Sequence, residues 1–219
     1  MATLEFWADY ICPWAYVARV RIDPLIKEYK NSVKLEIKAL PLEWVNGVPT
    51  SRESLEAEWW VAAVHDRRAV FGLYRDNTFP NTAIPVFRAG KAVLSQSYDK
   101  FLEFDLQVRR ALFQDGMDIS KVDVLLSIAS RVGLDLDRFR KYMDSEESLE
   151  AVKQDYEQGR EKLDPQGSPS FVLPNGKQLY NPAAASITWD RDRIVGLNPP
   201  PCIDSNCDEI YRLLFEISK

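Results

Sequence analysis

The sequence predicts an α/β protein in which a long helical segment interrupts a single mixed sheet. Three observations support this prediction. The first 40 residues follow a β-α-β pattern, about a hundred residues after them are mostly helical, and strand patterns return near residue 170 before a final helix. We therefore expect a sheet whose two halves come from opposite ends of the chain.

Apolar residues occupy every second position in two short segments near the N-terminus, which predicts two strands. These segments are residues 4–8 and 33–37. The helix between them is expected to begin at Pro13, because proline favours the first helical position. We expect Asp23-Pro24 to interrupt this helix and to start a second segment. The general crossover rule makes the two strands parallel.

Helical periodicity dominates the middle of the chain. The capping-box spacing from Thr50 to Glu53 predicts the start of one helix. Ser120 is expected to cap another helix, which ends at Gly133, and Asp135 is expected to cap the next one. The other expected helices cover residues 83–93, 98–113 and 146–161.

The C-terminal part predicts a hairpin and a helix. Residues 170–173 and 177–180 have strand character, and Asn175-Gly176 between them predicts a two-residue turn. Residues 181–206 are expected to be irregular. The last helix has an apolar stripe with helical spacing, made of Ile210, Leu213, Leu214 and Ile217.

This order of elements is typical of a thioredoxin-like fold with an all-helical insertion domain. The predicted boundaries are residues 1–48 for the first half of the thioredoxin-like domain, 49–145 for the helical insertion domain and 146–219 for the second half.

Composition excludes several classes of protein. The chain has 219 residues, of which 46% are hydrophobic and 28% charged, which is typical of a folded globular protein. No apolar run approaches the ~20 residues that a membrane span needs. A net charge of −5 disfavours a nucleic-acid partner. One histidine and three cysteines disfavour a metal site, and an N-terminus without a basic leader predicts a cytoplasmic protein.

Cys12 is the strongest candidate for chemistry, because it lies between a strand and the start of a helix. Free N–H groups at a helix N-terminus stabilise a thiolate and lower the pKa of cysteine from about 8.5 to roughly 3.5–7.5. A nearby Asp9 would act in the opposite direction. A single cysteine is more often a buried structural residue, but the strand-Cys-Pro-helix context favours a reactive thiol.

Residues 9–16, Asp-Tyr-Ile-Cys-Pro-Trp-Ala-Tyr, resemble the active-site segment of DsbA-family oxidoreductases of the FrnE-like branch, which reads Cys-Pro-Trp-Cys-Tyr. They are also similar to the related branch of kappa-class glutathione transferases and 2-hydroxychromene-2-carboxylate isomerases. Residues 118–135 resemble the insertion helices of the family. Residues 167–172 are similar to a family segment, Gly-Val-Pro-Thr-Phe-Val, whose proline is cis and faces the active-site cysteine.

The resemblance implies a disulfide oxidoreductase that acts by thiol-disulfide exchange. Its catalytic residues would be Cys12, Pro13 and Trp14, with Trp14 as an exposed aromatic residue beside the thiol. The substrate would bind at Ser168, Pro169 and Ser170, through backbone groups of the proline loop.

Ala15 departs from the family pattern, because it occupies the position of the second cysteine. Without that thiol, Cys12 can form a mixed disulfide but cannot release it locally. Three explanations remain open. The protein works as a monothiol with a small thiol, it uses a distant thiol, or Ala15 is an introduced substitution.

Cys202 and Cys207 are the remaining cysteines, and they resemble the extra C-terminal pair of some FrnE-like proteins. A resolving or redox pair that serves Cys12, a small loop disulfide and two ordinary cysteines all stay open. No bound cofactor or metal is expected, but glutathione or another low-molecular-weight thiol is a candidate co-substrate.

Two other functions stay open beside the oxidoreductase. One is a glutathione-dependent transferase or isomerase, in which Cys12 replaces the serine of that branch. The other is a non-catalytic binding protein that keeps the fold. The expected partner is a small thiol or disulfide, or a protein disulfide, and the expected state is a monomer or homodimer, without nucleic acid or membrane.

Other polar and aromatic residues are expected to be structural. The residues expected on solvated faces are His65, Arg67, Arg68, Arg109 and Arg110. The aromatic residues of the helical block are expected mostly in the core, with a few lining a groove beside the sheet: Trp59, Trp60, Phe71, Tyr74, Phe79 and Phe87.

Overall fold

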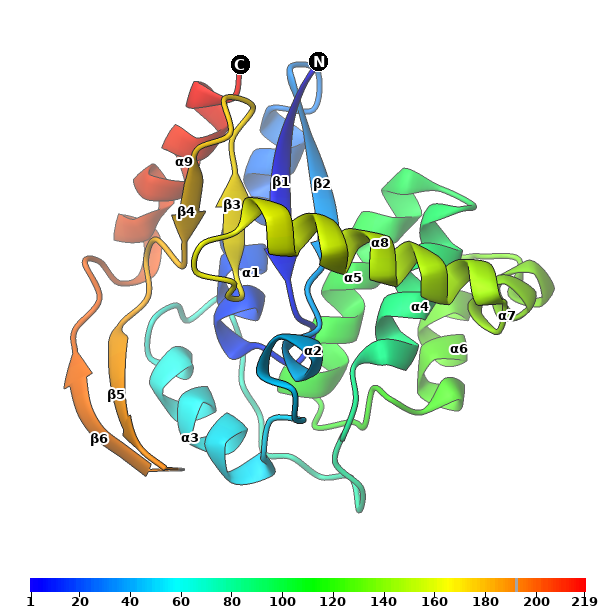
Figure 1. Ribbon diagram of the computed structural model, residues 1–219, viewed down its shortest axis with the longest axis horizontal. Helices are drawn as coiled ribbons and strands as arrows, with labels where there is room; N and C mark the ends of the chain where they lie inside the picture. Colours follow the sequence, from blue (N-terminus) through cyan, green and yellow to red (C-terminus); the bar gives the residue numbers. More distant parts are fainter. Residues whose placement is uncertain (192) are drawn as a thin grey trace.

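The computed structural model describes residues 1–191 and 193–219, and the main sheet among them has the strand order β2-β1-β3-β4 (Figure 1). β1 pairs in parallel with β2 and antiparallel with β3, and β3 pairs antiparallel with β4. The predicted parallel pair and mixed sheet are therefore confirmed. The strands are β1 (Ala2–Ala8), β2 (Val33–Ala39), β3 (Ser170–Val172) and β4 (Gln178–Tyr180).

Helices cover both faces of this sheet. Leu4 and Phe6 of β1 join the main core on the face that α1 and α9 cover. Trp7 points to the other face and packs with Val172 and Leu163, where α8 crosses the sheet (Figure 1). Because both faces are covered, Trp7 is as deeply buried as its neighbours. The three helices are α1 (Pro13–Glu28), α8 (Glu146–Lys162) and α9 (Asp208–Ile217).

The helices between the two halves of the sheet confirm the predicted helical block. α4 lies at the centre of a cluster and contacts α5, α6, α7 and α8, to one side of the sheet (Figure 1). α3 lies apart from this cluster, against α1 and the strand β6 (Arg193–Asn198). The side chain of Asp135 caps α7, and Gly133 follows α6 with φ of 73°, as predicted. The bounds are α2 (Leu42–Asn46), α3 (Arg52–Ala63), α4 (Ile84–Leu94), α5 (Tyr98–Phe113), α6 (Val122–Arg131) and α7 (Leu136–Met143).

The predicted interruption of the first helix at Asp23-Pro24 is wrong, because α1 runs through both residues. The carboxylate of Asp23 pairs with Arg19 at 2.9 Å, one turn earlier, and so does not cap a new helix. Leu25, directly after the proline, is buried. This burial holds the last turn of α1 although Pro24 lacks an N–H group.

Two predicted helix caps are wrong by one residue. Ser51, and not Thr50, caps α3 with its side chain. Lys121 occupies the N-cap position of α6, while the hydroxyl of Ser120 donates a hydrogen bond to a nearby aspartate. Thr50 and Ser51 both carry a hydroxyl group, so the sequence pattern alone does not distinguish them, and α6 begins without a side-chain cap.

The hairpin between β3 and β4 is confirmed, but its turn is one residue earlier than predicted. Gly176 donates its N–H to the carbonyl oxygen of Leu173 at 2.8 Å, which places Pro174 and Asn175 at the centre of the turn. Gly176 follows with φ of 83°. The position after the turn has a left-handed backbone conformation, which glycine adopts most easily, so Gly176 closes the hairpin.

Residues 181–206 are not irregular as predicted, because they contain a second sheet of two antiparallel strands. In β5, Ile187 and Trp189 are half-buried and alternate with exposed residues. This alternation covers only five residues, and three prolines follow the second strand at residues 199–201. The two strands were therefore hard to identify from the sequence. The elements are β5 (Ser186–Asp190), β6 (Arg193–Asn198) and the 3-10 helix η1 (Asp204–Cys207).

The buried face of α9 differs from the predicted stripe. Tyr211, Leu214 and Phe215 are buried, whereas Leu213 and Ile217 are exposed. Both sets have helical spacing, but the set with two aromatic rings removes more apolar surface from water. Among the described residues, no helix combines the length and the apolar character that a membrane crossing requires.

Candidate active site

Cys12 lies at the N-cap of α1, directly before Pro13, as the sequence predicts. Its side chain is buried, and its Sγ donates a hydrogen bond to the carbonyl oxygen of Ser168 at 3.2 Å. The Ser168-Pro169 peptide bond is cis. The fold thus brings together two predicted site segments that are more than 150 residues apart in the chain.

Asp9 fixes the loop that presents Cys12. Its carboxylate accepts hydrogen bonds from the backbone N–H groups of Ile11 at 3.0 Å and Leu42 at 2.6 Å. Its own N–H donates to Ser168 Oγ at 2.8 Å, and its carbonyl oxygen accepts from Arg109 at 2.8 Å. Burial outweighs these contacts and raises the pKa of Asp9 to about 6. One residue therefore ties the cysteine loop to three other segments.

Arg109 is fully buried, so the prediction that it lies on a solvated face is wrong. It pairs with Asp105 of the same helix, and Asp105 also pairs with the buried Arg19 of α1 at 2.9 Å. Arg110, the next residue, is exposed. Adjacent helix positions face different directions, so the two arginines differ although the sequence treats them as a pair.

The thiol of Cys12 is not activated in the way that its helix position suggests. Burial, with smaller contributions from the negative charges of Glu58 and Asp9, raises the pKa of Cys12 to about 12. The backbone N–H of Ala15 opposes this change only in part. The predicted lowering of the pKa is therefore wrong for this conformation, because desolvation of the thiolate exceeds the stabilisation by the helix N-terminus.

Cys12 borders an open pocket of about 610 Å³. Its wall includes Trp14, Glu58 of α3, Tyr180 at the end of β4 and Trp189 of β5. Burial raises the pKa of Glu58 to about 7. A larger hollow of about 960 Å³ lies around the far part of α1, but Cys12 and the proline loop do not line it. The pocket beside Cys12 is therefore where a substrate could reach the thiol.

Tyr180 and Gly167 shape the proline loop. The ring of Tyr180 lies so close to Gly167 that an added Cβ would come within 2.3 Å of it. Ser170 donates its hydroxyl to the carbonyl oxygen of Gly167 at 2.8 Å. A side chain at position 167 would therefore displace the ring of Tyr180, which forms part of the pocket wall.

Trp14 and His65 are both buried, contrary to the expectation of an exposed tryptophan and a solvated histidine. Their rings meet edge to face with centroids 4.8 Å apart. Burial, with a smaller effect from the charge of Arg21, lowers the pKa of His65 to about 4. His65 therefore supports Trp14 as a neutral packing partner. It does not act as a base near the thiol.

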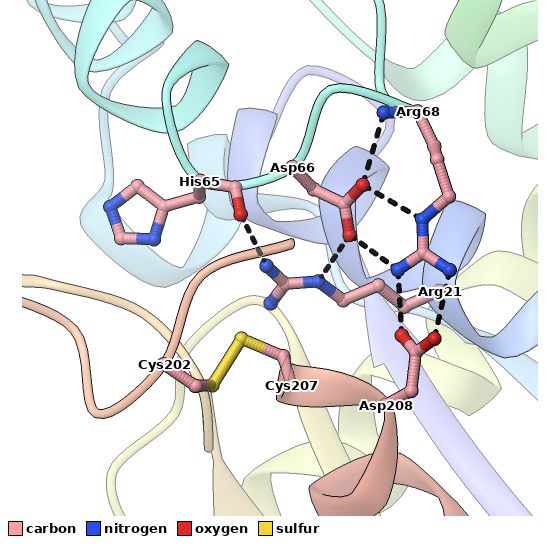
Figure 2. The surroundings of a disulfide bond; sticks show 7 residues. All are labelled: Arg21, His65, Asp66, Arg68, Cys202, Cys207 and Asp208. Carbon is pink, nitrogen blue, oxygen red and sulfur yellow. Dashed lines mark hydrogen bonds and ion pairs between the residues drawn. A yellow bond between two sulfur atoms is a disulfide. The ribbon is translucent and has the colours of Figure 1, made fainter. Parts of the chain in front are cut away.

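Cys202 and Cys207 form a disulfide with each other (Figure 2). Of the three alternatives for this pair, the structure therefore contains the small loop disulfide. Neither cysteine lines the pocket beside Cys12. Within the disulfide loop, the N–H of Asp204 donates to the carbonyl oxygen of His65 at 2.8 Å. The loop therefore supports the segment that holds His65 against Trp14.

Ion pairs surround this segment (Figure 2). Asp66 accepts from Arg21 at 2.8 Å and from Arg68 at 2.7 Å, and Arg68 also pairs with Asp208 at the start of α9. Arg67 is exposed, as predicted, and pairs with Asp204. These contacts join α1, the segment after α3 and the C-terminal helix around the disulfide.

The remaining predicted aromatic residues do not line the pocket. The ring of Trp59 packs against Phe71, Tyr74 and Phe113, and Trp60 is exposed. No three histidine, cysteine, aspartate or glutamate side chains in the described part of the chain gather as metal ligands would.

Sequence reasoning missed three elements of the site: Glu58, Tyr180 and β5. Glu58 is one of several glutamates in α3, and nothing in its spacing distinguishes it. The sequence pattern indicates a strand at Tyr180 but no role in a pocket. Only β5 has a recognisable sequence pattern, which is the short alternation of apolar and polar residues.

Comparison with known proteins agrees with this geometry. Residues 6–187 match the family model described as Thioredoxin. The uncharacterised protein YwbO from Bacillus subtilis (strain 168) is 22% identical over 181 residues, which cover 78% of this chain and 86% of YwbO.

Two solved structures share the fold. Cytosolic disulfide reductase DsbM from Pseudomonas aeruginosa, solved with GSH, is 18% identical, with a TM-score of 0.64 over 81% of this chain and 88% of that chain. A 2-hydroxychromene-2-carboxylate isomerase is 16% identical, with a TM-score of 0.63 over the same shares of the two chains. Both branches suggested by residues 9–16 are thus among the structural relatives, and at these identities the likeness shows the fold alone.

Proposed function

The chain belongs to the thioredoxin family, and from that premise we propose that it is a DsbA-type thiol-disulfide oxidoreductase that acts through a single cysteine, Cys12. One observation carries this proposal. The Sγ atom of Cys12 lies 3.2 Å from the carbonyl oxygen of Ser168, beside the cis Pro169, at the border of an open pocket. This position puts the thiol beside a backbone carbonyl group and next to a space that a substrate can enter.

In the proposed reaction, Cys12 exchanges partners with a disulfide. Cys12 loses its proton to the solvent, and its sulfur attacks one sulfur of the substrate disulfide. A new bond joins Cys12 to that sulfur, the substrate bond breaks, and the other sulfur leaves and takes up a proton. Because Ala15 offers no second thiol, an external low-molecular-weight thiol must attack the mixed disulfide and restore Cys12. DsbM, which was solved with GSH, supports a small thiol as co-substrate.

The other site residues support this exchange in different ways. Pro13 starts α1 and so fixes the position of Cys12 at its N-terminus. Trp14 forms part of the pocket wall that Cys12 borders. Ser168 lines the pocket and would present its backbone to a bound substrate. The carbonyl oxygen of Pro169 accepts a hydrogen bond from the N–H of Asn181 at 2.9 Å, and Ser170 holds the loop from behind through Gly167.

A glutathione-dependent transferase or isomerase is the weaker hypothesis. No lysine or arginine among the described residues lines the pocket, so glutathione carboxylates would lack a cationic partner there. Cys12 also stands where that branch has serine. DsbM is a cytosolic protein, and its likeness to this chain supports the cytoplasm as the proposed compartment.

Reduction of insulin by dithiothreitol tests the proposed function. We expect the wild-type protein to accelerate the reaction, and the Cys12→Ser variant to leave it at the uncatalysed rate. The variant Cys202→Ser/Cys207→Ala is the matched control, since it removes the two other sulfur atoms and keeps Cys12. Full activity of Cys12→Ser would refute the proposal.

A further inference from the structure

The pocket beside Cys12 has an unusual charge. Glu58 is the only described residue in its wall with a carboxylate, and no described lysine or arginine lines it. The other lining side chains are aromatic, aliphatic, amide or hydroxyl groups. When Glu58 is ionised, the pocket is therefore anionic, with no compensating cation in its wall.

No described residue near Glu58 neutralises its charge. Its side chain is half-buried in α3, and burial is the only influence on its pKa, which rises to about 7. No described cation or N–H donor offsets this effect. Glu58 is thus mostly ionised in mildly alkaline solution and has no ion-pair partner among the described residues, which leaves its carboxylate available for a ligand.

The charge of Glu58 also reaches the reacting sulfur. After burial, it is the largest contribution to the raised pKa of Cys12, ahead of Asp9. Burial raises the pKa of Tyr180, another residue of the pocket wall, and the charge of Glu58 adds to this effect. A charged group on a small molecule that binds next to Cys12 would therefore interact with Glu58 at short range.

We propose that Glu58 selects substrates by charge, so that Cys12 reacts with disulfides that bear a protonated amine near the sulfur atoms in preference to anionic glutathione disulfide. This inference rests on the proposed function and names the substrate class of the same site. An ammonium group in the pocket pairs with the carboxylate, whereas the carboxylates of glutathione disulfide are repelled and meet no cation.

The reaction is the exchange described above, with cystamine as the substrate of the preferred class. The sulfur of Cys12 forms a bond to one sulfur of cystamine, and the disulfide bond of cystamine breaks. The other half leaves as cysteamine and takes up the proton that Cys12 has lost. Cys12 is oxidised to the mixed disulfide, and one half of cystamine is reduced.

The experiment compares the rates of adduct formation at pH 8 for three disulfides by intact-protein mass spectrometry. The probes are cystamine, which is cationic, bis(2-hydroxyethyl) disulfide, which is neutral, and glutathione disulfide, which is anionic. Each rate is divided by the rate with the neutral probe, so that a change in the reactivity of Cys12 cancels. The variants are Glu58→Gln and, as a matched control on the same helix, Glu53→Gln, which removes an exposed charge outside the pocket.

We expect Glu58→Gln to reduce the cystamine to glutathione disulfide rate ratio about tenfold, because attraction and repulsion both disappear. Glu53→Gln should leave this ratio within about twofold of the wild-type value, since an exposed charge is screened. An equal ratio in wild type and Glu58→Gln, with normal reaction of the neutral probe, overturns the inference and leaves the proposed function intact. No Cys12 adduct with any probe overturns both.

Discussion

Arg109, buried in α5, donates a hydrogen bond of 2.8 Å to the carbonyl oxygen of Asp9, three residues before Cys12 in the chain. Through this bond the helical block fixes the loop that presents the thiol. Arg109 also pairs with Asp105, which is fully buried and pairs with Arg19 of α1. The position of Cys12 therefore depends on a buried ion network as well as on its own strand and helix.

The substitution Arg109→Met is expected to lower the free energy of unfolding by about 3 kcal/mol, because it leaves the buried carboxylate of Asp105 with only one of its two cationic partners. Arg110→Met is the matched control and should change it by less than about 0.5 kcal/mol, since Arg110 is exposed. Urea denaturation measures both. Equal stability of the two variants would contradict a structural role for the buried network.

The raised pKa of Cys12 predicts a specific pH profile. Only the thiolate reacts, and with a pKa of about 12 its fraction grows tenfold with each pH unit far below that value. The rate of alkylation by iodoacetamide should therefore rise about tenfold per unit from pH 6 to 10 without a plateau. Cys12→Ser supplies the background rate.

A plateau near pH 7 would show that the thiol is activated in solution, which the buried conformation does not allow.

The raised pKa of Cys12 also makes the stability of the fold depend on pH. Because the folded pKa lies above the unfolded value, Cys12 destabilises the fold as pH rises from about 9 to 12, when the unfolded thiol loses its proton first.

The Cys202–Cys207 disulfide should stabilise the fold without taking part in turnover. It closes a short loop, and its removal in Cys202→Ser/Cys207→Ala is expected to cost about 2 kcal/mol of unfolding free energy. Insulin reduction per folded molecule should stay within about twofold of wild type. Loss of turnover at unchanged stability would instead identify the pair as the resolving thiols of Cys12.

Restoring the second motif cysteine should change how the mixed disulfide is released. In Ala15→Cys, a thiol one helical turn after Cys12 can attack the mixed disulfide within the molecule. We expect release without external thiol to become at least about tenfold faster than in the wild type, because an intramolecular attack replaces a bimolecular one. Mass spectrometry of a preformed adduct follows this directly.

Ala15 is fully buried, so the added sulfur should also lower stability by about 1–3 kcal/mol. Ala18→Cys is the matched control, since it places a thiol at an equally buried position one turn further from Cys12. If Ala15→Cys retains the adduct as long as the wild type does, the geometry of the site, and not only the absent thiol, prevents release.

The sequence predicted the architecture well, because strand alternation, turn glycines and helix caps are local patterns. In residues 33–37, apolar and polar residues alternate, so the buried and the outward face of the strand can be read from the sequence. Asp135 caps its helix as expected. The failures occur where two candidates satisfy one pattern. Leu213 and Tyr211 both fit the spacing of α9, and only packing against Phe171 selects the tyrosine.

The candidate site was predictable only in part, for the same physical reason. Cys12 and Ser168-Pro169 have a recognisable context in the sequence, and the fold brings them together. The raised pKa of Cys12 depends on burial and on Glu58, which belongs to a distant helix. Likewise, Arg109 and His65 look like surface residues until their partners in other elements are known.

Mass measurement of intact protein after exposure to bis(2-hydroxyethyl) disulfide at pH 8 tests the central claim most directly. A reactive Cys12 predicts a single adduct of one hydroxyethylthio group, absent from Cys12→Ser and removed by added thiol. The same protein without an adduct after long incubation, or an adduct that persists in Cys12→Ser, would contradict the assignment of Cys12 as the reactive thiol.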